Sequence, residues 1–322
     1  MRQRVYHSRH PFWVMVQKEV MDSINSWRFI ILLGLMLLTT VASLYTAMSN
    51  LRSAILDDTA TPFVFLKLFT ATDGTLPPFI TFISLLGPII GIALGFDAVN
   101  SERGRGTLSR LLAQPIPRDY IINAKFVASL LLITVMILTL GLLMTGIGIL
   151  VTGIPPTPEE FWRIFFFLLV SIVFIGVWLN LAIMFSVRFR QPATSALSGL
   201  AVWLFFSLFF SMLVNIIVEA TAPAHITDVT QIIGYQGFVQ NLLRISPSQL
   251  FSEATTTLLV PTIRTLGPIT LEQAYGAIAG PLPLGQSLLL VWPQLTGLTA
   301  AACIIFGLSY VLFMKQEVRS RS

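Results

Sequence analysis

The chain has 322 residues, of which 55% are hydrophobic and only 11% are charged. Soluble domains have about 25% charged residues, so this composition excludes a soluble globular protein. The net charge of +5 is scattered over several short segments, which argues against a nucleic-acid surface and leaves membrane lipid as the expected surroundings.

The segment before the first long apolar run, residues 1–28, predicts an amphipathic helix. Trp13, Val16, Val20, Ile24 and Trp27 recur at helical spacing among polar neighbours. Basic residues flank this apolar face, which favours a helix lying in the cytosolic membrane interface. The alternative is a helix packed on another protein surface.

Six apolar runs are each long enough to cross a bilayer, which needs about 20 residues. The predicted spans are Phe29–Ala47, Phe79–Val99, Phe126–Val151, Phe161–Val187, Ala196–Val218 and Leu288–Met314. Of the 20 lysines and arginines, 15 fall in segments that these spans place on one side. Because cytosolic loops carry the excess of Lys and Arg, both termini are predicted to be cytosolic.

The predicted fold class is an all-α membrane protein with six transmembrane helices, an interfacial N-terminal helix and an external helical segment between spans five and six. We divide the chain into a cytosolic N-terminal segment (1–28), five spans with a cytosolic loop at 100–125 (29–218), an external helical subdomain (219–287), and the sixth span with a cytosolic tail (288–322).

Gly87, Gly91 and Gly95 form a GxxxGxxxG pattern in the second predicted span. Small residues at this spacing let two helices approach closely. The pattern leaves two interpretations open: packing within the chain, or a contact with a second copy or a moving element.

The polar connection after this span is the most informative segment of the chain. Leu108, Leu111 and Leu112 fall at i, i+3 and i+4, which predicts a short amphipathic helix, and Gly106 allows the turn before it. With no protein of its own expected nearby, the leucine ridge is predicted to dock into another subunit. Glu102 is predicted to pair with a basic residue of the loop or of that partner.

Asp97 stands at the inner end of the second predicted span. It is predicted to pair with Arg103 or Arg105 and so to fix the loop, a role compatible with gating.

The segment between the last two spans predicts three short helices. One covers Ile232–Leu243, a second begins at the cap Ser246-Pro247-Ser248-Gln249, and a third begins at Thr270. These helices are too short or too polar to span a bilayer, so we expect them to lie against the outer mouth or dip partly into it.

The sequence offers no catalytic or metal-binding motif. It has no run of the form G-x-x-x-x-G-K-[ST], so any ATP and Mg²⁺ are expected in a partner. Its three histidines form no HExxH or Ser–His–Asp set, and Cys303 is its only cysteine. The spans are almost free of charge, which argues against an ion-coupled carrier.

The connecting loop resembles the signature of type-2 ABC exporter permeases. The residues that carry the resemblance are Glu102, Gly106, Thr107, Leu108, Leu111, Leu112, Pro115, Arg118 and Lys125. Asp97 matches an acidic position that these permeases often hold just before the glutamate. The external helical segment adds a looser similarity to the copper-processing permeases of nitrous oxide reductase maturation.

The resemblance implies the permease subunit of an exporter in a prokaryotic cytoplasmic membrane. It implies that two ATPase copies bind ATP and Mg²⁺, that a second copy of this chain completes the translocator, and that the loop couples the two kinds of subunit. Two alternatives remain: a stand-alone ion-coupled carrier or channel, and a non-transporting scaffold for membrane assembly.

Overall fold

Long helices dominate the part of the chain that the computed structural model describes, which is residues 10–56, 63, 65–72, 76–153, 155–221, 229–263 and 281–315. Within these ranges every regular element is a helix. Six helical spans there are long and apolar enough to cross a membrane, which confirms the predicted number. They are Trp27–Ser49, Phe79–Gly104, Arg118–Thr152, Pro158–Arg188, Pro192–Thr221 and Leu284–Met314.

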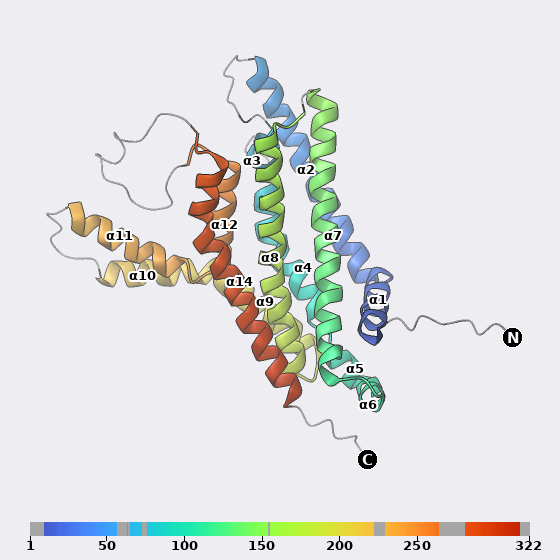
Figure 1. The fold of residues 1–322 in the computed structure, drawn as a ribbon. Helices are drawn as coiled ribbons and strands as arrows, with labels where there is room; N and C mark the ends of the chain where they lie inside the picture. The colour runs from blue at the N-terminus through green and yellow to red at the C-terminus, as the bar shows by residue number, and fades with distance from the viewer. Residues whose placement is uncertain are drawn as a thin grey trace.

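Short helices precede, join and interrupt these spans (Figure 1). The elements are α1 (Pro11–Ile24), α2 (Trp27–Leu56), α3 (Lys67–Thr70), α4 (Phe79–Gly95), α5 (Asn100–Gly104), α6 (Thr107–Leu112), α7 (Arg118–Thr152), α8 (Pro158–Arg188), α9 (Pro192–Leu204), the π-helix η1 (Phe205–Phe209), α10 (Phe210–Thr221), α11 (Val229–Leu243), α12 (Pro247–Leu259) and α14 (Leu284–Met314). We call the end that carries α5 and α6 the basal end, and the end where α8 begins the apical end (Figure 1).

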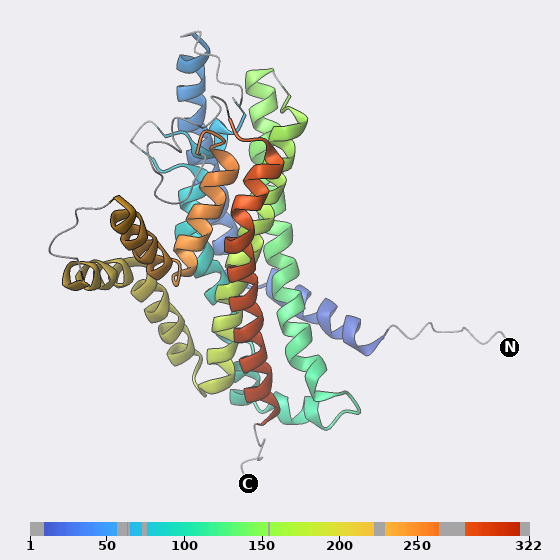
Figure 2. The same cartoon turned by 60° about the vertical axis from the view of Figure 1, so that its left-hand side comes forward.

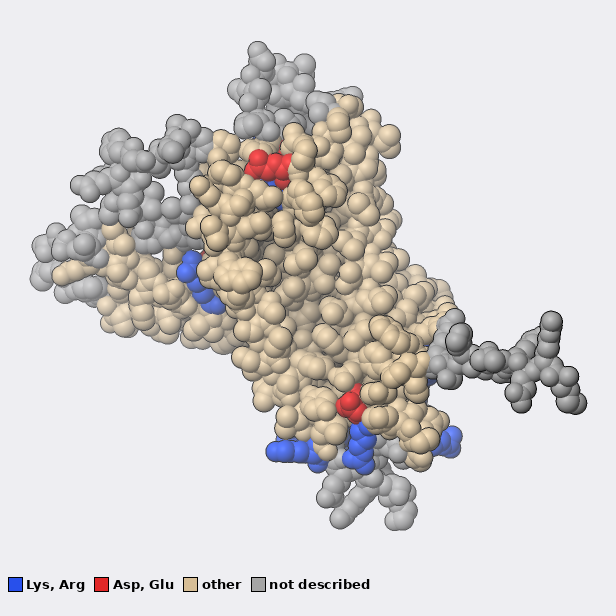
Figure 3. Space-filling model, in the orientation of Figure 1, with Lys and Arg blue, Asp and Glu red and all other residues tan. Residues whose placement is uncertain are grey.

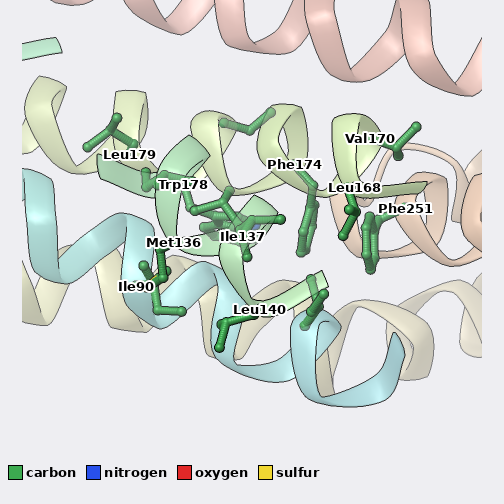
Figure 4. Packing of buried hydrophobic residues seen from close by; sticks show 14 of the residues in the cluster. Ile90, Met136, Ile137, Leu140, Leu168, Val170, Phe174, Trp178, Leu179 and Phe251 are labelled. Atoms are coloured by element: carbon green, nitrogen blue, oxygen red, sulfur yellow. The ribbon is translucent and has the colours of Figure 1, made fainter. Parts of the chain in front are cut away.

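Helix α8 is the centre of the bundle. In its most apolar stretch 67% of the residues are buried, against 6% in the fifth span. Its large side chains Phe174 and Trp178 lie among residues of α4, α7 and α12 (Figure 4). The side chains that the neighbouring helices bury against α8 therefore fix the positions of those helices.

The glycine pattern of the second span packs α4 against α8 within the chain. A Cβ atom on Gly91 would lie 2.7 Å from the carbonyl oxygen of Ile175, and one on Gly95 would lie 2.8 Å from that of Leu179. Gly87 faces the side chain of Ile175. The three glycines thus lie against a helix of their own chain, as the first of the two interpretations predicts.

The apical end of α8 is fixed by charged side chains. A capping box begins the helix, because the Thr157 hydroxyl accepts from the Glu160 N–H while the Glu160 carboxylate accepts from the Thr157 N–H. Arg163 has no exposed surface, and its guanidinium donates to the Glu159 carboxylate, to two backbone carbonyls and to the Ser287 hydroxyl. These bonds hold the end of α12 and the start of α14 against α8.

Helix α12 runs along the apical half of α8. Phe251 near its start stacks on Phe174 in the middle of α8, with ring centroids 4.3 Å apart (Figure 4). Leu258 near its end accepts a bond from Arg163. The predicted helices at Ile232 and Pro247 are confirmed as α11 and α12, while the one expected at Thr270 lies outside the described residues.

The fifth span leaves the body of the bundle. Figures 1 and 2 both show α10 and α11 extending away from the other helices. The change of direction follows the π-helix η1, whose wider turn is a recognised cause of bends in long helices.

Helix α1 packs on α7 near the basal end. Val16 is buried between them with Ala124 and Ala128. Trp13 on the same helix is 58% exposed, so α1 keeps an uncovered apolar surface as well as a contact with its own chain.

Candidate functional site

A triad of charged side chains joins three elements at the basal end. Lys125 in α7 is 7% exposed, and its Nζ lies 2.7 Å from Glu102 Oε1 in α5 and 3.0 Å from Glu19 Oε2 in α1. Glu102 therefore pairs with a basic residue at the end of the loop, as one of the two predicted arrangements requires. A buried ammonium between two carboxylates fixes the positions of all three elements, because each partner would be costly to leave unpaired.

The predicted partner of Asp97 is wrong. Its Oδ2 lies 2.6 Å from Nη1 of Arg28 at the start of α2, and within the described residues it forms no salt bridge with Arg103 or Arg105. The same guanidinium lies over the ring of Phe96, 5.2 Å from its centroid. The reason is that the start of α2 lies beside the end of α4, a neighbourhood that spacing along the chain does not reveal.

The leucine ridge of α6 is also different from the prediction. Leu108 is 1% exposed and belongs to the core of the chain itself, and Leu111 is partly buried against that core. The side chain of Leu112 lies outside the described part of the structure. Leu108 thus anchors the loop to its own bundle and does not form an outward ridge, because its side chain is buried in the hydrophobic core of the same chain.

The turn into α6 follows the prediction. Gly106 has φ +70°, a left-handed conformation that favours glycine. The Thr107 hydroxyl donates to the carbonyl of Glu102, 3.2 Å away, so the loop folds back on α5. Pro115 and Arg118 after α6 are exposed at the start of α7.

The break between α4 and α5 is bonded to α8. The backbone N–H groups of Val99 and Asn100 both donate to the Ser186 hydroxyl, at 2.9 and 3.2 Å. Sequence reasoning missed this acceptor, since a single serine in an apolar span carries no pattern that marks it.

A hollow of about 710 Å³ lies at the basal end, lined by residues of α1, α2, α4, α5, α6 and α7. Its lining carries both signs of charge, including the triad, the Arg28–Asp97 pair, and the loop residues Arg105 and Arg110. Figure 3 shows Lys and Arg gathered at this basal end, while most of the visible surface between the two ends is uncharged. A mixed lining of this kind suits a polar protein surface better than a small ion of one charge.

Sequence reasoning also missed a polar cluster around Glu253 in α12. Its side chain is 8% exposed and accepts from Arg244, Gln249 and Gln294, at 2.8, 3.1 and 3.0 Å. The sequence predicts that this segment lies against the outer mouth or dips partly into it, and that prediction does not identify Glu253 as a buried carboxylate. Among the described residues, no group of three His, Cys, Asp or Glu side chains could hold a metal ion.

Comparison with known proteins finds one family over nearly the whole chain. The family described as "ABC-2 family transporter protein" matches residues 13–318. Two similar proteins are both named "Probable ABC transporter permease protein NosY". The one from Stutzerimonas stutzeri is 28% identical over 203 residues, which are 62% of this chain and 68% of that protein. The one from Pseudomonas aeruginosa is 27% identical over 207 residues, with the same two shares.

Proposed function

Because the chain belongs to the ABC-2 transporter family, we propose that a separate ATPase drives it through the loop formed by α5 and α6. The chain is a multi-pass transmembrane subunit of an ABC transporter, and it is not itself the ATPase. The observation that carries the proposal is the Glu19–Lys125–Glu102 triad. It ties the loop to α1 and to α7, so a force applied to the loop acts on both.

The ATPase in this proposal contacts the exposed polar surface of the loop. Arg105, Arg110 and Gln114 are exposed and line the basal hollow, whereas Leu108 is covered by its own chain. The partner therefore binds charged and amide groups, and Leu108 transmits the movement to the bundle. Glu102 links the two, since it lies between the exposed loop and buried Lys125.

The basal end faces the cytosol in this proposal, which puts both termini there. The excess of Lys and Arg in basal segments supports this orientation.

Two copies of this permease and two copies of the ATPase make one exporter. ATP closes the ATPase pair, the loops move with it, and the two bundles tilt between two states as rigid bodies.

A charge reversal on the loop tests the proposed contact. Arg110→Glu should weaken co-purification with the ATPase several-fold, because it opposes charge complementarity at an exposed contact. Arg188→Glu is the matched control, since Arg188 is an exposed arginine at the end of α8, outside α5 and α6. Equal capture of the ATPase by the wild type and Arg110→Glu would overturn the contact.

The same preparation separates the two alternative functions. A stand-alone carrier would move its substrate in vesicles that contain the permease without any ATPase. A scaffold would capture the ATPase but show no substrate-dependent ATP hydrolysis. An ATPase that is captured and stimulated by substrate supports the proposed transporter.

A further inference from the structure

A second hollow, of about 320 Å³, lies where α4, the η1–α10 segment and the start of α12 meet. It is formed by residues other than those of the basal site. Helix α12 starts in the middle of the bundle, as the stacking of Phe251 on Phe174 shows. The hollow therefore lies beside a helix that begins inside the bundle and runs only to its apical end.

Hydroxyl groups are gathered around this hollow from all three segments. They belong to Thr81, Ser84, Ser207, Ser211, Ser246 and Ser248. Among the described residues, the remaining lining is one amide side chain and apolar residues, with no charged side chain and no Met, Cys or His. Such a lining offers hydrogen-bond donors to oxygen atoms and has no soft ligand for a transition metal.

Two of these hydroxyls have no bonding partner. Ser246 is 4% exposed, and its Oγ and the Oγ of Ser248 are buried without a hydrogen bond. Ser246 is the N-cap residue of α12, yet its side chain makes no capping bond. A buried hydroxyl without a hydrogen-bond partner costs free energy. A ligand that accepts hydrogen bonds from both hydroxyls removes this cost.

The electrostatics of the hollow favour a negative ligand. The 13-residue α12 presents its N-terminus here, which is the positive end of its dipole. No acidic residue stands in its first turn. Glu253, farther along α12, is already paired with Arg244 at 2.8 Å. Interrupted helices in membrane proteins often place such N-terminal ends against anionic groups.

Apolar side chains from the same segments also line the hollow. Phe206 and Phe210 come from the π-helix and the turn after it, and their ring centroids are 5.3 Å apart. Leu85 and Leu243 are the other apolar residues of the lining. A ligand that suits this lining has an anionic oxygen group and an apolar part.

We propose that this hollow binds the oxyanion group of an amphipathic molecule, of the chemical class of an alkyl phosphate. The inference rests on the proposed function, because it names a ligand class for the permease. It uses none of the loop residues, so a failure of this inference can be told apart from a failure of the proposed loop contact.

Binding to the purified full chain in uncharged detergent micelles tests the proposal. Isothermal titration calorimetry would compare dodecyl phosphate with dodecanol and with inorganic phosphate. Dodecyl phosphate should bind, and dodecanol should bind about ten-fold more weakly or worse, because it lacks the anionic group. Equal binding of dodecanol and dodecyl phosphate would overturn the oxyanion site. If inorganic phosphate binds as tightly as dodecyl phosphate, the oxyanion stands but its source is the free ion.

Three variants complete the test. Ser246→Ala combined with Ser248→Ala should weaken dodecyl phosphate binding by about ten-fold. Ser252→Ala is the matched control, since Ser252 is an exposed serine of the same helix outside the hollow. Ser248→Asp should abolish binding of dodecyl phosphate, because its carboxylate repels the phosphate group. Unchanged affinity in the double variant, with Ser252→Ala also unchanged, would refute the site.

Discussion

Replacing Lys125 by methionine should destabilise the basal end strongly. The change removes an ammonium that is 7% exposed and leaves two carboxylates, 19% and 14% exposed, without their cation. Breaking a buried ion pair by removing one partner costs about 3–5 kcal/mol. We expect the lower end of that range, because the carboxylate of Glu19 keeps some contact with water.

A neutral triad should recover most of this loss. In the combined variant Glu19→Gln, Glu102→Gln, Lys125→Met, the side-chain shapes are nearly kept and no buried charge remains unpaired. Replacing a whole buried charge cluster by neutral groups is often close to neutral for stability, so we expect a free energy of unfolding within about 1 kcal/mol of the wild type.

Glu102→Gln alone leaves Lys125 paired with Glu19, so it should cost little stability while uncoupling ATP hydrolysis from transport.

The assay is chemical unfolding of the detergent-solubilised chain, with limited proteolysis near α1 as a local readout. Lys125→Met should expose α1 to cleavage first, since this lysine holds α1 to α7. A Lys125→Met protein as stable as the wild type would refute the reasoning. So would a combined variant no more stable than Lys125→Met.

The remaining predictions concern packing, the apical end and orientation. Gly91→Ala should cost about 1–3 kcal/mol of unfolding free energy, because its Cβ would meet backbone atoms at 2.7 and 2.8 Å. Gly34→Ala is the control and should cost none, since its Cβ would have nothing within 4 Å. Equal unfolding free energies for the two variants would contradict the close α4–α8 contact. Arg163→Lys should cost about 3 kcal/mol or more in the same assay, since an ammonium cannot make the five guanidinium bonds at once; full stability would show that these bonds do not hold the apical end. In a Cys303→Ser background, Arg105→Cys should react with a membrane-impermeant thiol reagent only after the cells are opened, and labelling of intact cells would reverse the proposed orientation.

The spans could be predicted because their signal is local. A run of apolar residues of membrane length specifies a helix without reference to the rest of the chain, and α4, α8 and α14 all begin within four residues of the predicted starts. The third span begins eight residues before the prediction, at Arg118. Its first two turns include Arg118, Asp119 and Lys125, and their charge hid the helix from a hydropathy argument.

The partners of charged residues could not be predicted, because they depend on which helices lie side by side. Arg28 and Asp97 are 69 residues apart in the sequence and meet only because α2 begins beside the end of α4. Leu108 has the spacing of a docking ridge, and the same spacing serves equally well for attachment to its own bundle. Glu253 escaped notice for a related reason, since a short polar helix gives no sign that it starts inside the bundle.

The single hydroxyl of Ser186 has a mechanical consequence. Where α4 gives way to α5, a broken helix would ordinarily act as a hinge, because freed N–H groups allow the two pieces to swing independently. Here both freed groups are held by one atom of α8. The joint is thereby stiffened against the central helix, and if the proposed partner moves α6, we expect the movement to reach α8 instead of merely flexing the loop.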